Sequence, residues 1–421
     1  MIPRALAVLV AAAAAGAAPV GSLHRVPGRA GCISPADVPA PCRHARELRS
    51  NVVMSPDGRT VYTIGGIDSR SAIAVLRRDA RTGALEQLHG RAGCVHRYGR
   101  NCTTGVLNNP AALVVTSDGR EVVWANPPSV FEYLLVAYRR ARSSGALSQL
   151  PCGLRCVKGW HGLPSCVRAL AVSPDGRNLY VTCGRGLAIY ARDAATGRIT
   201  QLAGAHGCVS LHDVCAIPPV APFTPASVVV SNDGRSVYVL SSGADAVYAF
   251  TRDMATGALT PAACYVDAFL SAGNKRCRPL FGLKTAYVLD LSRDSRNAYV
   301  VGRSSSSGQA LVVLARAADG ALVRVATVRL GNVFPSGVTV SPDGKSVYVT
   351  DHNGVEVFAR ARDGTLSRLP GSFGRLRLHP ADTYAAPVVL SLSPDGRYAY
   401  IAAGYAPDGK PNRILVLRRT R

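Results

Sequence analysis

The apolar and polar positions of this chain follow one pattern many times over: a short apolar run, a polar turn, and a second apolar run. In one copy, residues 228–230 are three valines, a Ser-Asn-Asp-Gly-Arg turn follows, and apolar residues resume soon after it. The turn motif S-x-D-G-R recurs seven times, 49 to 61 residues apart, with Thr116, Ser295 and Lys345 as its only departures. Its aspartates are Asp57, Asp118, Asp175, Asp233, Asp294, Asp343 and Asp395. Short apolar runs joined by Asp-Gly turns predict antiparallel hairpins.

Two further strands complete each repeat. The second strand carries an aromatic residue at a nearly fixed place: Tyr62, Trp124, Tyr180, Tyr238, Tyr299, Tyr348 and Tyr400. The third strand ends in an arginine: Arg78, Arg140, Arg192, Arg252, Arg316, Arg360 and Arg419. A fourth segment then begins G-x-(L/I), at Gly83, Gly145, Gly197, Gly257, Gly320 and Gly364. One such four-stranded meander cannot bury both of its faces, but seven arranged around an axis can. We therefore predict an all-β fold, a seven-bladed β-propeller with four antiparallel strands per blade.

The last repeat stops after its third strand, at Arg421, and its missing fourth segment has a match near the start of the chain. Gly21 is followed eleven residues later by Cys32, and the same interval separates Gly83 from Cys94. We therefore predict that the mature N-terminal strand closes the last blade, which also removes an exposed sheet edge.

Two Tyr-Val-Thr runs, at residues 180–182 and 348–350, each follow an S-P-D-G turn. In this respect the chain resembles the YVTN-type bacterial propeller repeat proteins and the wider group of seven-bladed lactonase-like propellers. The resemblance covers essentially the whole mature chain. It implies the propeller fold and allows a lactonase-like activity, but its motifs specify blades and carry no catalytic residue over.

The first twenty residues are typical of an export signal. Arg4 supplies a positive charge, residues 5–18 are apolar or small, and small residues suitable for a signal peptidase follow. We predict a signal peptide over 1–20, one propeller domain over 21–421, and a secreted or extracytoplasmic location at the cell envelope. No segment of the mature chain is long and apolar enough to predict a membrane span.

Cysteine usage agrees with export. The chain has 12 cysteines, none with the CxxC spacing of a zinc site, so we predict disulfides and no bound metal. Five pairs lie close together in the sequence: Cys32 with Cys42, Cys94 with Cys102, Cys156 with Cys166, Cys208 with Cys215, and Cys264 with Cys277. The two that remain, Cys152 and Cys183, are predicted to pair with each other.

The formal net charge is +23, and only a few of the 49 basic residues are lysines. Such a charge attracts anionic envelope polymers, acidic proteins or small anionic ligands through salt-sensitive contacts. No nucleic-acid-binding motif is present, so we predict no specific nucleic-acid partner. The turn motifs and third-strand arginines should lie together on one face, which we call the turn face. Because the motif repeats in every blade, we expect most of these basic residues to pair with the turn aspartate of their own blade or with Asp79, Asp193 or Asp253 nearby.

The remaining candidates for chemistry lie near the propeller axis and on the opposite face, which we call the loop face. Asp290 is a carboxylate in an apolar inner strand; it is either a general base or ligand, or a structural group bonded to Thr339 or to a neighbouring backbone. Asp351 and His352 follow a second strand and could act with Asp290. Candidate ligand-binding residues in comparable loops are Arg185, Arg303 and Asp68.

Searches for P-loop, HExxH, GxSxG and Rossmann patterns find nothing, and no cofactor is predicted. The leading interpretation is an exported binding or interaction module at the cell envelope or outside the cell. The alternative is a lactonase-like hydrolase that uses the axial funnel, with water as the nucleophile.

Overall fold

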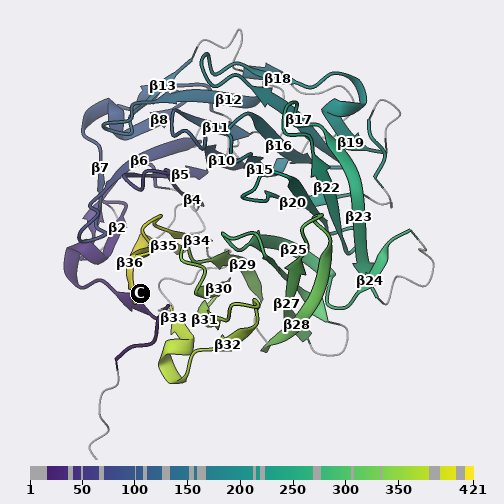
Figure 1. Cartoon of the computed structure of the whole chain (residues 1–421). Coiled ribbons are helices and arrows are strands. Elements are labelled where there is room, and N and C mark those ends of the chain that lie inside the picture. The colour runs from purple at the N-terminus through teal and green to yellow at the C-terminus, as the bar shows by residue number, and fades with distance from the viewer. Residues whose placement is uncertain are drawn as a thin grey trace, which may run out of the picture.

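Seven mainly antiparallel sheets surround a central axis in the computed structural model, confirming the seven-bladed propeller (Figure 1). The structure describes residues 17–36, 41–48, 51–65, 71–99, 101–107, 111–125, 133–150, 156–158, 167–211, 215–218, 223–268, 276–304, 308–331, 334–378, 389–403 and 413–421. No helix in these ranges is long and apolar enough to span a bilayer.

The first four blades follow in chain order, each running from its inner strand to its outer edge. Blade one contains β4 (Asn51–Met54), β5 (Thr60–Gly65), β6 (Ala72–Arg78), β7 (Leu85–Gln87), β8 (Cys94–His96) and β9 (Thr103–Thr104). Blade two contains β10 (Ala112–Val115), β11 (Glu121–Ala125), β12 (Tyr133–Arg140), β13 (Leu147–Gln149) and β14 (Cys156–Lys158). Blade three contains β15 (Val167–Val172), β16 (Asn178–Cys183), β17 (Gly186–Arg192), β18 (Ile199–Gln201) and β19 (Cys208–Ser210). Blade four contains β20 (Pro225–Val230), β21 (Ser236–Ser241), β22 (Ala246–Arg252), β23 (Leu259–Asp267) and β24 (Arg278–Leu280).

The last three blades repeat the arrangement. Blade five contains β25 (Lys284–Leu291), β26 (Asn297–Ser304), β27 (Gly308–Arg316) and β28 (Leu322–Gly331). Blade six contains β29 (Pro335–Val340), β30 (Ser346–Asp351), β31 (Gly354–Arg360), β32 (Leu366–Arg368) and β33 (Arg375–Arg377). Blade seven contains β34 (Val389–Leu392), β35 (Tyr398–Ala403), β36 (Arg413–Arg419) and, from the N-terminus, β1 (Leu23–Arg25), β2 (Cys32–Ser34) and β3 (Arg43–His44).

The N-terminal segment closes blade seven, as predicted. In the antiparallel register of β1 and β36, Leu23 lies opposite Arg419, and the Gly21 amide donates to the Thr420 carbonyl at 2.8 Å. Tyr348 of blade six also donates its hydroxyl hydrogen to the Gly21 carbonyl, at 2.8 Å. This segment therefore joins both its own blade and the neighbouring one.

The outer strand is more elaborate than the four-stranded prediction. In blades one, two, three, six and seven it is broken into two short pieces that both pair with the third strand. In blades seven, one, three and six, a single-turn 3₁₀ helix lies between the pieces: η1 (Gly28–Gly31), η3 (Gly90–Gly93), η4 (Gly204–Gly207) and η6 (Gly371–Gly374). In blades four and five the outer strand is continuous.

Apolar cores fill the spaces between neighbouring blades. Between blades three and four, for example, Tyr180 and Ile189 pack with Val239 and Tyr248, all essentially inaccessible to solvent. The S-x-D-G-R turns require a positive φ at the glycine position, and Ser295 adopts it with φ 53°. Its hydroxyl accepts a hydrogen bond from the Asn232 amide at 2.8 Å, which ties this turn to blade four.

Candidate functional site

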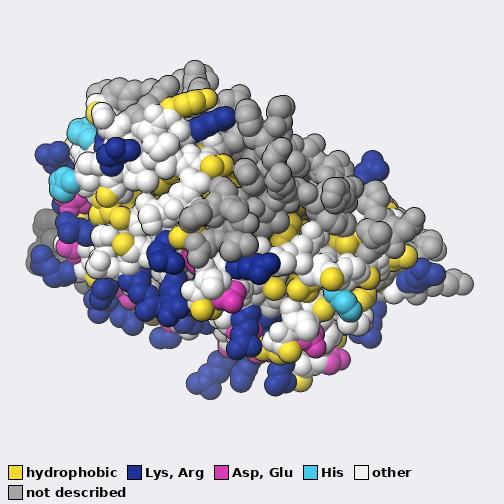
Figure 2. All heavy atoms as spheres, turned by 90° about the horizontal axis from the view of Figure 1, so that it is seen from above, with side chains coloured by type: hydrophobic (Ala, Val, Ile, Leu, Met, Phe, Trp, Pro, Cys, Tyr) yellow, Lys and Arg dark blue, Asp and Glu magenta, His cyan; other side chains and the backbone are white. Residues whose placement is uncertain are grey.

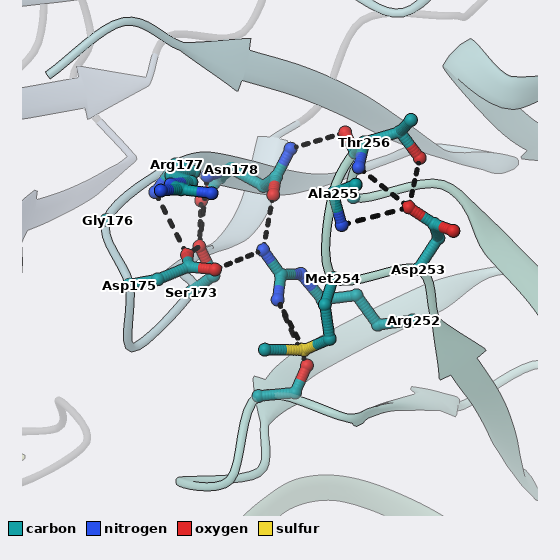
Figure 3. Close-up of polar contacts among 12 residues, drawn as sticks. Ser173, Asp175, Gly176, Arg177, Asn178, Arg252, Asp253, Met254, Ala255 and Thr256 are labelled. Atoms are coloured by element: carbon teal, nitrogen blue, oxygen red, sulfur yellow. Dashed lines mark hydrogen bonds and ion pairs between the residues drawn. The ribbon is translucent and has the colours of Figure 1, made fainter.

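The third-strand arginines of the turn face reach across to the preceding blade. In Figure 3, Arg252 of blade four donates to the Asp175 carboxylate of blade three at 2.8 Å and to the Asn178 side chain beside it. The same guanidinium donates to the carbonyl of Gly234 in its own turn at 3.1 Å. One arginine thus joins two blades, and its side chain is fully buried.

All seven blades repeat this ion pair, which we call the Arg–Asp latch. The arginine side chains are 0–6% exposed. The pairs are Arg78–Asp395, Arg140–Asp57, Arg192–Asp118, Arg252–Asp175, Arg316–Asp233, Arg360–Asp294 and Arg419–Asp343. The expectation that each arginine pairs within its own blade is therefore wrong. Because the sheets stack face to face, the guanidinium lies between two turns. It binds the glycine carbonyl of its own turn and the aspartate of the turn in the preceding blade.

The second-strand tyrosine completes the latch in six of the seven places. Arg140 donates from Nε to the Tyr62 hydroxyl at 3.0 Å, and that hydroxyl donates to the Gly145 carbonyl at 2.7 Å. Burial raises the pKa of Tyr62 to about 12, so the phenol stays neutral and can donate. The aromatic position is therefore a polar connector between blades as well as a core residue.

Blade two departs from this rule because Trp124 stands where the other blades have tyrosine. There the buried Glu121 carboxylate accepts from Arg192 Nε at 2.8 Å. The Asp118 carboxylate accepts from the same guanidinium at 3.0 Å. Sequence reasoning missed Glu121, although the pairing of a lone tryptophan with a lone glutamate in the repeat could have revealed it.

The latch keeps the turn carboxylates ionised. Desolvation acts to raise the pKa of Asp57, but hydrogen bonds from Ser55, the Arg59 amide and Arg140 outweigh it, and the pKa lies below its ordinary value. The pKa is lowered in the same way at all seven turn aspartates. Each latch is thus a charged pair near neutral pH.

Asp79, Asp193 and Asp253 also differ from the expectation. Each accepts hydrogen bonds from backbone amides of its own turn between the third and fourth strands; Asp193, for example, binds Ala195 and Thr196, both at 2.8 Å. These carboxylates shape turns, and the structure shows no ion pair between them and a basic turn residue of the described chain.

The basic residues of the turns themselves remain exposed, and we call them the basic ring: Arg59, Arg120, Arg177, Arg235, Arg296, Lys345 and Arg397. Within the described residues none of them forms an ion pair, because the turn carboxylates are already engaged by the latches. In a view across the rim of the disc, Lys and Arg side chains gather along one edge of the molecule (Figure 2). The turn face therefore presents cations that nothing in the described chain neutralises.

Asp290 lies on the inner strand of blade five, where it is half-buried. Its carboxylate accepts from the Leu291 amide at 2.8 Å and from the Val340 amide of blade six at 3.0 Å. Desolvation raises its pKa to about 6 despite these two hydrogen bonds. Of the two structural partners anticipated, the neighbouring backbone is therefore the one observed, since the Thr339 hydroxyl donates to the Leu390 carbonyl instead.

Asp351 and His352 lie far from Asp290. Two residues of β29 mark the separation. The Val340 amide binds Asp290, and Pro335, five residues earlier in the same strand, lies opposite Asp351 of β30. That separation is about 17 Å along a strand. Asp351 is buried and bound by Arg375 at 2.8 Å, while the half-buried His352 ring lies 6.5 Å from that of Phe334. The structure does not bring the three predicted catalytic candidates together.

Arg375 forms a network that the sequence did not reveal. Besides Asp351 it binds the buried Glu356 at 3.1 Å, and Arg368 binds the other oxygen of Glu356 at 2.8 Å. Burial raises the pKa of Glu356, and the two arginines oppose that shift. Arg375 follows Gly364 by eleven residues, the interval that places a cysteine in other blades, and this spacing was an available signal.

Two of the three predicted ligand-binding residues, Arg185 and Arg303, lie in the described part of the chain. Arg185 lies exposed in the turn between β16 and β17 on the loop face. Arg303 belongs to β26, where it lies opposite Lys284 of β25. Asp68 lies outside the described residues. In the described ranges, no group of three or more His, Cys, Asp or Glu side chains is arranged to hold a metal ion.

Four predicted disulfides are confirmed: Cys32–Cys42, Cys94–Cys102, Cys208–Cys215 and Cys264–Cys277. Each folds its loop so that the residue after one cysteine pairs in parallel with the residue after the other, as Val95 does with Thr103. Cys156 starts β14, but Cys166 and Cys152 lie outside the described residues. The pairing predicted for the buried Cys183 therefore stays a prediction.

Comparisons with known proteins support the propeller fold and assign no family to the chain. No family model matches the chain, so the YVTN-type assignment stays a prediction, and no curated protein matches it. A periplasmic gluconolactonase of Pseudomonas aeruginosa is 21% identical with a TM-score of 0.58, covering 76% of this chain and 84% of that one. The β-propeller domain of Cps50 (Swd1) from Myceliophteria thermophila is 14% identical with a TM-score of 0.56, covering 89% and 98%. Hydrazine synthase of Kuenenia stuttgartiensis is 17% identical with a TM-score of 0.54, covering 91% and 96%. At these identities the likeness shows the fold alone, a propeller shared by proteins of unrelated function.

Proposed function

We propose that this chain is an exported binding module that docks on anionic polymers of the cell envelope through its turn face. The observation that carries the proposal is the basic ring. Its seven exposed cations have no carboxylate partner in the described chain, because the Arg–Asp latches engage the turn aspartates. A face that carries such an uncompensated charge concentrates polyanions by long-range attraction.

The described surface favours a polymer without bases over a nucleic acid. Single-stranded nucleic acids are held by aromatic platforms on which bases stack. The exposed aromatic residues of the described chain are Tyr98, Phe281 and Phe334, and all three lie in loops away from the turn motifs. An acidic polysaccharide or a teichoic-type polymer needs only cations at intervals, which the basic ring supplies.

Binding of the oxidised chain from Gly21 onward to poly(glycerol phosphate) tests the proposal. We expect saturable binding that weakens steeply between about 0.05 and 0.5 M salt, because exposed charges are screened over that range. A triple ring variant should weaken binding at least about tenfold, a loss of roughly 1.4 kcal/mol. Its changes are Arg59→Gln, Arg177→Gln and Arg397→Gln.

The control removes the same charge from the loop face, with the changes Arg185→Gln, Arg278→Gln and Arg377→Gln. We expect it to reduce affinity only about twofold, since it alters net charge without altering the docking face. Equal losses for the two variants would show that net charge alone, and no particular face, governs binding.

A lactonase-like hydrolase is the second candidate, and Asp290 is the observation that favours it. A half-buried carboxylate with a pKa near 6 is suited to general-base catalysis close to neutral pH. One similar structure is that of a periplasmic gluconolactonase. The hydrolase interpretation requires turnover of at least one lactone in a panel. It also requires Asp290→Asn to abolish that turnover while the protein stays folded.

A further inference from the structure

One hollow on the turn face lies between blades two and three. Its volume is about 430 Å³, and its walls are Arg120, Glu121, Arg139, Arg140, Arg142, Ala194 and Ala195. That volume is within the range of small-ligand sites, roughly 300–1,000 Å³. Four of the seven lining residues are arginines of blade two, and they come from its S-x-D-G-R turn, its third strand and the turn after that strand.

The hollow keeps a net positive charge after every described contact is counted. Its one carboxylate, Glu121, is bound by Arg192 at 2.8 Å and is 6% exposed, so it is not available to the arginines of the hollow. Arg140 is likewise engaged by Asp57. Arg120, Arg139 and Arg142 remain exposed, and in the described chain none of them forms an ion pair.

Two of these exposed arginines are held in place without being neutralised. Arg120 donates from Nη1 to the Ala194 carbonyl at 3.3 Å, and Arg142 donates from Nη2 to the Asp118 carbonyl at 2.8 Å. A backbone carbonyl takes one N–H of a guanidinium and leaves its charge and its other donors free. The side chains are thus partly ordered before any ligand arrives, which reduces the entropy lost on binding.

The sequence of blade two favours a positively charged hollow at this place. Blades one, three and four carry an aspartate directly after the latch arginine, whereas blade two carries Ala141 there, as blades five and six carry Ala317 and Ala361. Blade two therefore has no carboxylate from this position beside its arginines. The small side chains of Ala194 and Ala195 leave the far wall open. Arg139 stands where blades three and four have Ala191 and Thr251, and its counterparts in blades one and seven are Arg77 and Arg418.

We propose that this hollow binds a phosphate or sulfate group carried by an anionic glycopolymer. The inference rests on the proposed function and deepens it: the basic ring attracts the chain of charges, and the hollow takes one charged group. Guanidinium groups match the spacing of oxyanion oxygens and donate pairs of charge-assisted hydrogen bonds to them. The remaining volume has room for part of the sugar that carries the group.

A matched pair of double variants tests the inference by calorimetry with poly(glycerol phosphate) and with glycerol 1-phosphate. Arg139→Gln with Arg142→Gln removes two arginines of the hollow. Arg235→Gln with Arg296→Gln removes two exposed arginines of the basic ring outside it. We expect the hollow variant to weaken polymer binding about tenfold or more and to abolish saturable binding of the monomer. The ring variant should weaken polymer binding about two- to threefold and leave monomer binding intact.

The outcomes separate the two proposals. Equal losses for both variants, with no saturable monomer binding by the unaltered chain, would overturn the hollow while leaving the docking face in place. An unaltered chain that binds neither probe would overturn both. Tighter binding of a DNA duplex than of the glycerol polymer, lost in the hollow variant, would overturn the assignment to a glycopolymer. Unchanged unfolding midpoints of both variants keep each of these results interpretable.

Discussion

The two faces of the propeller are built on different principles. On the turn face, one Arg–Asp latch is repeated seven times, and each copy joins a blade to the one before it. Towards the loop face, the contacts found in the described residues differ between blades. Four disulfides close loops in blades seven, one, three and four, and an ion network around Arg375 lies in blade six.

The difference shows which features belong to the fold and which are free to serve function. A contact present in every blade is required by the stacking of blades, so the buried latch arginines are structural. Departures from the repeat, such as Trp124 and Glu121 in blade two, need a local explanation. The uncompensated hollow lies beside these departures, and Glu121 forms part of its wall.

The largest expected effect comes from removing the closure that serves both faces. A chain beginning at residue 35 lacks β1 and β2, so the edge of β36 is unpaired and Tyr348 loses the Gly21 carbonyl as its acceptor. We expect aggregation or loss of cooperative folding, because an exposed edge strand is a template for association. Soluble yield and urea unfolding measure this. An unfolding midpoint equal to that of the chain from Gly21 onward would refute the closure.

Breaking one latch should cost less, but still a large part of the stability of the protein. Arg252→Ala leaves the Asp175 carboxylate without its buried partner and the Tyr180 hydroxyl without its donor. Loss of one member of a buried ion pair costs about 3–5 kcal/mol. The neighbouring exposed residue gives a matched control, since Arg177→Ala should change the free energy of unfolding by less than about 0.5 kcal/mol. Urea unfolding measures the change in free energy of unfolding for both variants. Similar changes for Arg252→Ala and Arg177→Ala would contradict the structural role of the latch.

The loop face can be tested by comparing a disulfide with the network of blade six. Cys94→Ser with Cys102→Ser reopens a short loop, which should cost about 2–3 kcal/mol. Arg375→Met leaves Asp351 and Glu356 buried with one fewer cation, and we expect a loss of about 3 kcal/mol. Reduction by dithiothreitol should destabilise the Arg375 variant as much as the unaltered chain. It should destabilise the cysteine variant of blade one by less, since one disulfide is already absent while those of blades three, four and seven remain. An Arg375 variant as stable as the unaltered chain would show that the network contributes nothing.

The two faces were also unequally predictable from sequence. The repeated positions predicted the blades, the N-terminal closure and four disulfides that the structure confirms, because periodic patterns report on local structure directly. The direction of the latches could not be predicted in this way: Arg140 meets Asp57 of another blade, 83 residues away, through the stacking of sheets. The sequence predicts that Asp290 and His352 lie near the axis, but it does not reveal at which end of a strand two blades bring side chains together.

Asp290, on the inner wall between the two faces, carries the smallest expected effect and one opposite in sign to that of the latches. Its pKa is raised by burial to about 6, so its contribution to stability is full below its unfolded pKa and is lost as pH rises through 6. The turn aspartates have lowered pKa values in the folded protein. Their contribution to stability is therefore present above their unfolded pKa and is lost as the pH falls through their folded pKa values. The Asp290→Asn variant should therefore lack a decline of about 1–2 kcal/mol between pH 4 and 7, after allowance for the partial exposure of the carboxylate. Urea unfolding at half-unit steps of pH measures the difference. If the difference in free energy of unfolding between the unaltered chain and the Asp290→Asn variant stayed constant from pH 4 to 7, the Asp290 carboxylate would not be desolvated at the axis.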